Sequence, residues 1–108
     1  MDRKAEIRRY KEREASGGIY AMRCTETGKI WVGATPSLDK IANRQFFTLR
    51  QGTNPNAGLQ AAWNRSGGDA LIFEAIEALG EDVPALARPR VLKERLAHWL
   101  EALEASRI

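Results

Sequence analysis

The strongest constraint on the fold of this 108-residue chain is a pair of short segments with a period-two hydrophobic pattern. The segments, 19–24 (IYAMRC) and 29–34 (KIWVGA), are joined by the polar link 25–28 (TETG). Two such segments around a short polar link that ends in glycine indicate a β-hairpin. Because neighbouring side chains of a strand lie on opposite faces, Ile19 and Tyr20 are expected to face different sides of the sheet.

A helix is expected directly after the hairpin. Thr35 can serve as its N-cap, with Pro36 at the first helical position. Apolar residues then recur at the three- and four-residue spacing of a helix with one buried face: Leu38, Ile41, Ala42, Phe46 and Leu49. Gly52 is expected to end this helix.

The rest of the chain predicts two more helices and one more strand. Asn56 can cap a helix that runs through Asn64. Residues 71–76 favour a strand, because Leu-Ile-Phe follows a Gly-Gly break. Pro89 starts a last helix with an apolar side.

The N-terminal residues differ from this pattern. A charged helix with few apolar side chains is expected over residues 2–14, within a segment 1–16 that precedes a main domain at 17–108. The order of elements predicts an α+β fold, with a three-stranded sheet flanked by helices.

Composition excludes several classes of protein. No apolar run approaches the ~18 residues of a membrane span, and the charged start is unlike a signal peptide. A cytoplasmic protein without a membrane partner is therefore expected. The single cysteine, Cys24, excludes an internal disulfide, and with the single His98 it leaves few ligands for zinc, so no metal ligands are assigned.

Charge is divided unevenly along the chain. Residues 1–65 carry 12 Lys+Arg and 6 Asp+Glu, a net charge of +6, whereas residues 66–108 carry 5 and 8, a net charge of −3. A basic half favours a polyanionic partner, and an ordinary solvated surface with interspersed charges is the alternative.

The most specific motif combines Gly18-Ile19-Tyr20 on the first strand with Trp31-Val32-Gly33 on the second. At this spacing the pair resembles the GIY-YIG nuclease superfamily, and in particular its short stand-alone bacterial members. The resemblance covers residues 17–79 well and the last helix weakly. It continues in the following positions: Gly52, Asn54-Pro55-Asn56, Leu59-Gln60, Trp63-Asn64, Gly67 and Phe73.

The resemblance implies a three-stranded antiparallel sheet and a phosphodiesterase that uses one divalent metal. In that family a motif tyrosine activates water, an arginine and a histidine or tyrosine on the first helix assist, and a glutamate on the last helix holds the metal. Tyr20 keeps the first role, whereas Trp31 has no ionisable hydroxyl. The arginine position is Ile41, the position one turn later is Gln45, and the glutamate position is Leu96.

Two interpretations of these substitutions remain. Either the nuclease site is degenerate and the fold binds without cutting, or Arg44, three residues after the lost arginine, takes its place beside Tyr20, Trp31 and Gln45.

Basic residues lie where the resembling family meets its substrate, and Tyr20 and Trp31 could stack on bases. These predicted binding residues are Arg23, Lys29, Lys40, Arg44 and Arg50. By contrast, Gln60 and Asn64 are expected to bridge the loop around Asn54, and Trp63 and Trp99 to pack in the core.

The leading hypothesis is a nucleic-acid-binding protein with a degenerate nuclease site, with DNA favoured over RNA and no cofactor. The alternative is an atypical endonuclease that uses Tyr20 and Arg44 with Mg²⁺ or Mn²⁺. A third is a protein-interaction module that docks a protein partner through the helix at 2–14 and the acidic C-terminal half.

Overall fold

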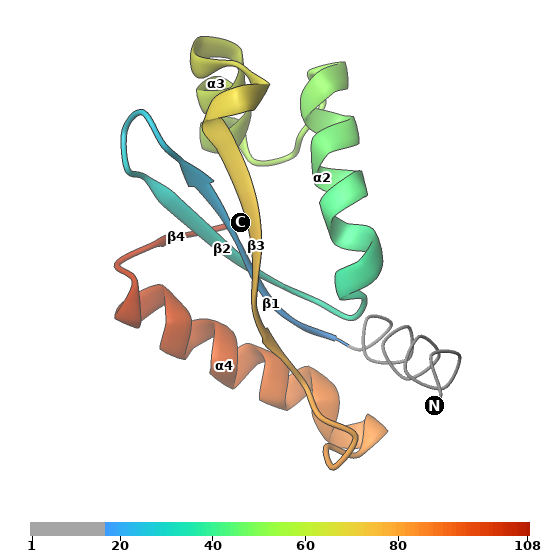
Figure 1. The fold of residues 1–108 in the computed structure, drawn as a ribbon. Helices are drawn as coiled ribbons and strands as arrows, with labels where there is room; N and C mark the ends of the chain where they lie inside the picture. Colours follow the sequence, from blue (N-terminus) through green and yellow to red (C-terminus); the bar gives the residue numbers. More distant parts are fainter. Residues whose placement is uncertain (1–16) are drawn as a thin grey trace, which may run out of the picture.

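The computed structural model of the protein describes residues 17–108. In this range a four-stranded sheet carries helices on both faces (Figure 1). The α+β class predicted from the sequence is confirmed. The predicted helix at 2–14 and the N-terminal segment 1–16 lie outside the described residues.

The predicted hairpin forms from β1 (Gly18–Cys24) and β2 (Ile30–Thr35), which pair antiparallel. In this register Tyr20 lies opposite Gly33. The turn closes at Gly28, whose φ of 76° suits glycine and whose N–H donates to the Cys24 carbonyl at 2.8 Å.

Two further strands flank the hairpin, in the order β3-β1-β2-β4. β3 (Leu71–Ala78) pairs antiparallel with β1 and runs two residues beyond the predicted strand. β4 (Ser106–Arg107) pairs parallel with β2, so the predicted count of three strands was wrong. A two-residue strand shows no periodicity of its own, and the Ile108 N–H helps to hold it by donating to the Val32 carbonyl at 3.0 Å.

Helix α2 (Leu38–Gln51) begins later than the sequence predicted. Thr35 is the last residue of β2, and its hydroxyl accepts a hydrogen bond from the Ser37 N–H at 3.1 Å. Ser37 is therefore the N-cap, and Pro36 precedes the helix rather than opening it. Gly52 ends the helix as expected, with a φ of 76°.

Helices α3 (Ala57–Ser66) and α4 (Arg88–Ala102) agree more closely with the sequence. The Asn56 side chain caps α3 by accepting from the Leu59 N–H at 2.9 Å, and the helix ends two residues after Asn64. Short 3₁₀ helices at Gly68–Ala70 and Ala85–Ala87 lead into β3 and α4. Pro89 lies in the first turn of α4, one residue after its start.

The sheet separates two apolar clusters. Tyr20 and Met22 belong to the cluster under α2 and α3, whereas Ile19 and Ala21 belong to the cluster under α4, as the strand pattern predicted. Figure 1 shows α2 and α3 on one side of the sheet and α4 on the other. Both predicted core tryptophans pack at these clusters: Trp63 on the first and Trp99 on the second.

A polar contact joins α4 to β3. The Glu77 Oε1 accepts from Arg95 Nε and from Trp99 Nε1, both at 2.8 Å. Burial raises the pKa of Glu77, but these hydrogen bonds together with the Arg95 charge outweigh it and hold the pKa below its usual value. Within residues 17–108 no helix is long and apolar enough to cross a membrane.

We expect Gly18→Ala to lower the free energy of unfolding by about 3 kcal/mol. A Cβ at this position would overlap the Glu77 carbonyl oxygen and lie 2.6 Å from Leu38 Cδ1. Chemical denaturation with circular dichroism measures the effect.

Gly58→Ala is the matched control, because a Cβ there meets no atom closer than 3.4 Å. In helix α3 it should be neutral or stabilising by about 0.5–1 kcal/mol. Equal stability of Gly18→Ala and the wild type would contradict the close packing of β1 against β3 and α2.

Candidate functional site

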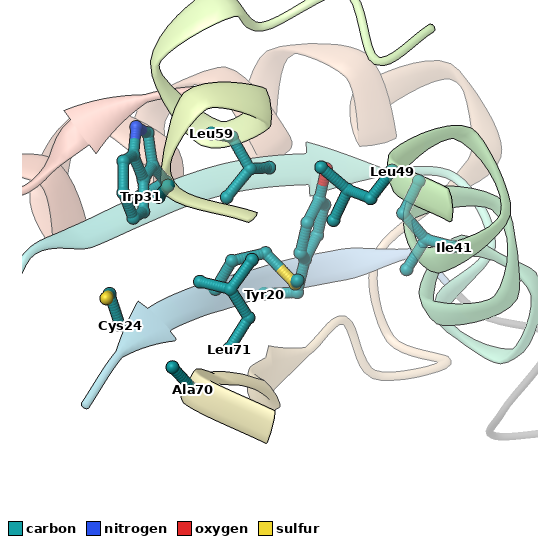
Figure 2. Packing of buried hydrophobic residues seen from close by; sticks show 10 residues of the cluster. Tyr20, Cys24, Trp31, Ile41, Leu49, Leu59, Ala70 and Leu71 are labelled. Atoms are coloured by element: carbon teal, nitrogen blue, oxygen red, sulfur yellow. The ribbon is translucent and has the colours of Figure 1, made fainter. Parts of the chain in front are cut away.

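Tyr20 and Gln45 meet inside the protein. Tyr20 projects from β1 toward α2 with 2% of its surface exposed, and Gln45 on α2 is 8% exposed. The Gln45 Nε2 donates a hydrogen bond to the Tyr20 hydroxyl at 2.8 Å. Figure 2 shows the Tyr20 ring among the apolar side chains of this cluster. The structure thus brings together two of the four predicted catalytic residues.

Gln45 is also one end of a buried polar network. The Asn54 Nδ2 donates to Gln45 Oε1 at 2.7 Å and to Thr48 Oγ1 at 2.9 Å. The Asn54 Oδ1 in turn accepts from the Asn56 N–H at 2.9 Å. These bonds connect α2 to the loop that leads into α3, so Gln45 and Asn54 pair each other's polar groups away from water.

Gln60 closes the same loop, as the sequence predicted. Its Oε1 accepts from the Asn54 N–H at 3.0 Å, and its Nε2 donates to Leu49 O and to Asn64 Oδ1, each at 3.1 Å. The Asn54-Pro55-Asn56 motif and the Gln60–Asn64 pair therefore have structural roles here.

The surroundings of Tyr20 determine its ionisation. Burial raises the pKa of the Tyr20 hydroxyl above its ordinary value, and the hydrogen bond from Gln45 offsets only part of this rise. At neutral pH the side chain is a phenol rather than a phenolate. A phenol whose oxygen is enclosed in a packed cluster is a poor general base for an external water.

The other two predicted catalytic residues lie elsewhere. Trp31, 3% exposed, belongs to the same apolar cluster but lies opposite Met22 in the hairpin, two pairs along from the Tyr20–Gly33 pair. Arg44 is exposed. Because adjacent residues of a helix differ by about 100°, Arg44 points away from the direction of Gln45.

The positions that align with the family's arginine and glutamate are on different sides of the sheet. Ile41 is buried with Tyr20 under α2, and Leu96 is buried in the cluster under α4. Residues 17–108 contain no group of three His, Cys, Asp or Glu side chains arranged to hold a metal ion. The position that aligns with the glutamate of the resembling family is the apolar Leu96, whose side chain cannot hold a cation.

The predicted binding residues fall into two groups. Arg23 pairs with Glu74 at 2.7 Å, and the Lys29 Nζ lies over the Trp31 ring, 5.2 Å from its centroid. By contrast, three exposed cations on α2 form no ion pair with any described residue: Lys40, Arg44 and Arg50.

An exposed aromatic residue that the sequence analysis did not single out accompanies these cations. Phe47 is 56% exposed. It lies on one helical face with Lys40, Arg44 and Gln51, at spacings of four, three and four residues. We call these four residues the basic strip. The sequence indicates that Phe47 is exposed, because its position falls outside the apolar stripe of the helix that contains Phe46.

Comparison with solved structures identifies the fold. No protein-family profile and no curated protein sequence matches this chain. The catalytic domain of the homing endonuclease I-TevI superposes with a TM-score of 0.69 and 23% identity over 86% of this chain and 98% of that domain. A point mutant of the catalytic domain of intron endonuclease I-TevI gives 0.68 and 24% over 82% and 84%. The GIY-YIG catalytic-domain fold predicted from the hairpin motif is confirmed.

We expect Tyr20→Phe and Gln45→Leu each to lower the free energy of unfolding by about 1–3 kcal/mol, because each leaves a buried polar group without its partner. The double variant should cost less than the sum of the two by at least about 0.5 kcal/mol. Urea denaturation of all four proteins measures this coupling.

Gln51→Leu, the same substitution at an exposed position of α2, is the control and should change stability by less than about 0.5 kcal/mol. Strictly additive costs for Tyr20→Phe and Gln45→Leu would contradict a direct hydrogen bond between them.

Proposed function

We propose that the protein binds nucleic acid, with DNA as its favoured partner, through the outer face of α2, and that it does not cut it. Two observations support the proposal. The fold is that of a catalytic domain taken from an endonuclease, an enzyme class that acts on nucleic acid. The surface of α2 also carries cations that pair with no acidic side chain of residues 17–108 and can therefore meet phosphates.

The basic strip is the observation that carries the binding part of the proposal. Lys40 and Arg44 are one helical turn apart, so their side chains can reach neighbouring phosphates of one strand. Phe47 adds an exposed ring of the kind that stacks on an unpaired base.

The state of Tyr20 supports the second part of the proposal, the loss of cleavage. Its hydroxyl accepts from Gln45 inside an apolar cluster, and its pKa is raised rather than lowered. Hydrolysis of a phosphodiester needs an activated water and positive charge at the phosphate. Arg44 could supply charge on the outer face of α2, but the packed Tyr20 hydroxyl faces inward.

We expect duplex DNA to bind with an affinity that falls steeply with salt concentration, because phosphate contacts release counterions. Lys40→Gln/Arg44→Gln should reduce the slope of log K against log[salt] by about 2, one for each lost phosphate contact. Fluorescence anisotropy with labelled DNA and RNA duplexes at several salt concentrations measures both quantities.

The matched control is Arg90→Gln/Lys93→Gln on α4, which removes the same charge on the opposite side of the sheet. Equal weakening by both double variants would assign binding to net charge rather than to α2. Failure of every duplex to bind at low salt would overturn the proposal.

We expect no cleavage of single- or double-stranded DNA or RNA with Mg²⁺ or Mn²⁺. The assay compares the wild type with Tyr20→Phe and Arg44→Ala on denaturing gels. Activity of the wild type that both variants lose would instead establish the metal-dependent endonuclease, whereas equal activity in all three would indicate a contaminating nuclease.

A further inference from the structure

A pocket of about 430 Å³ lies between the hairpin and α3. Lys29 and Trp31 line it from the hairpin side, and Gly58, Ala61, Arg65 and Ser66 line it from α3. None of these residues belongs to the basic strip, so the pocket is a separate feature of the surface. Its volume is within the range of sites that hold small organic ligands.

The pocket is open because α3 presents small side chains to it. Gly58 and Ala61 are three residues apart and therefore lie on one helical face. The close approach is visible at Gly58, where a Cβ would lie 3.5 Å from Trp31 Nε1. A larger residue at either position would take up the space between the helix and the indole.

The polar groups of the pocket are dominated by donors. Lys29 and Arg65 carry positive charge and have no acceptor, and the described residues that line the pocket include no acidic side chain. Ser66 adds a hydroxyl. A site of this kind favours a ligand that is anionic and rich in hydrogen-bond acceptors.

Trp31 adds an aromatic group and a further donor. The Lys29 Nζ lies over its ring, which fixes the ammonium group beside the indole. No described residue accepts a hydrogen bond from Trp31 Nε1, and no side-chain nitrogen or oxygen in residues 17–108 is both fully buried and unpaired. This N–H is therefore not fully buried, and because Trp31 lines the pocket it can donate to a ligand there.

From this arrangement we infer that the pocket takes one unpaired nucleotide, with its phosphate at Lys29 and Arg65 and its base at the edge of Trp31. The inference rests on the proposed nucleic-acid binding and adds a preference for unpaired strands. A base in a duplex is already paired and stacked and does not enter a pocket without being extruded. The same chemistry would accept a free nucleotide, so the experiment separates the two sources.

The test uses Ala61→Phe, which fills the pocket from an exposed position of α3, and Ala97→Phe, an exposed alanine on α4, as its matched control. Fluorescence anisotropy compares a 5′-phosphorylated single strand with a duplex of the same length. We expect Ala61→Phe to weaken the single strand at least about fivefold, the low end of one base–aromatic contact. Duplex affinity should stay within twofold, and Ala97→Phe should change neither.

A second variant and a second ligand complete the experiment. Lys29→Gln keeps the pocket open and should also weaken the single strand more than the duplex. Calorimetric titration with adenosine 5′-monophosphate tests the free nucleotide on the wild type and on Ala61→Phe. Binding that Ala61→Phe abolishes, without a change in strand affinity, would assign the pocket to free nucleotides.

The outcomes distinguish this inference from the proposed function. If Ala61→Phe bound both the single strand and adenosine monophosphate as tightly as the wild type does, the inferred nucleotide pocket would be overturned. Duplex binding that persists in that case would leave the proposed function intact. If the wild type bound no single strand or duplex but did bind the monophosphate, the proposed function would be overturned and the pocket would remain a nucleotide site. No binding of any ligand to the wild type would overturn both.

Discussion

The hydrogen bond from Gln45 to Tyr20 is the contact on which the arrangement around α2 depends. It joins β1, one of the two inner strands of the sheet, to α2 inside an apolar cluster, where an unpaired amide or hydroxyl would be costly. Asn54 then pairs with the remaining oxygen of Gln45 and ties in the loop before α3. The Gln45 side chain therefore connects three parts of the chain: β1, α2 and the loop before α3.

This contact also fixes what α2 presents to solvent. With Gln45 turned inward beside Ile41 and Leu49, the side of the helix opposite these three residues faces outward. Lys40, Arg44 and Phe47 are exposed for that reason. A residue position that the resemblance assigned to catalysis thus orients α2, and the exposed cations of α2 lie on its other face.

Local patterns predicted most of the fold. The hairpin, the apolar stripe of α2 and the Asn56 cap are each encoded within a few residues, and the structure contains all three. The start of α2 was misplaced because Thr35 and Ser37 are both good capping residues and only the pairing of β2 distinguishes them. β4 was missed because its two residues owe their conformation to β2.

The site was less predictable, because its features depend on contacts between distant segments. The family resemblance placed Gln45 near Tyr20, but it could not show that both side chains would be enclosed, since burial depends on α2, the sheet and the Asn54 loop together. The pocket needs β2 and α3 side by side, and nothing local in the sequence links Trp31 to Gly58.

The two proposed binding surfaces differ in the contacts that they offer to nucleic acid. One would determine the strength of binding and the other the preference for unpaired strands. The basic strip of α2 offers exposed cations, whose attraction to phosphates is screened by salt and does not depend on base pairing. The pocket beside Trp31 lies between the hairpin and α3 and is partly open to solvent, so its walls limit which groups fit into it. Because the two surfaces share no residue, substitutions can alter strength and strand preference independently.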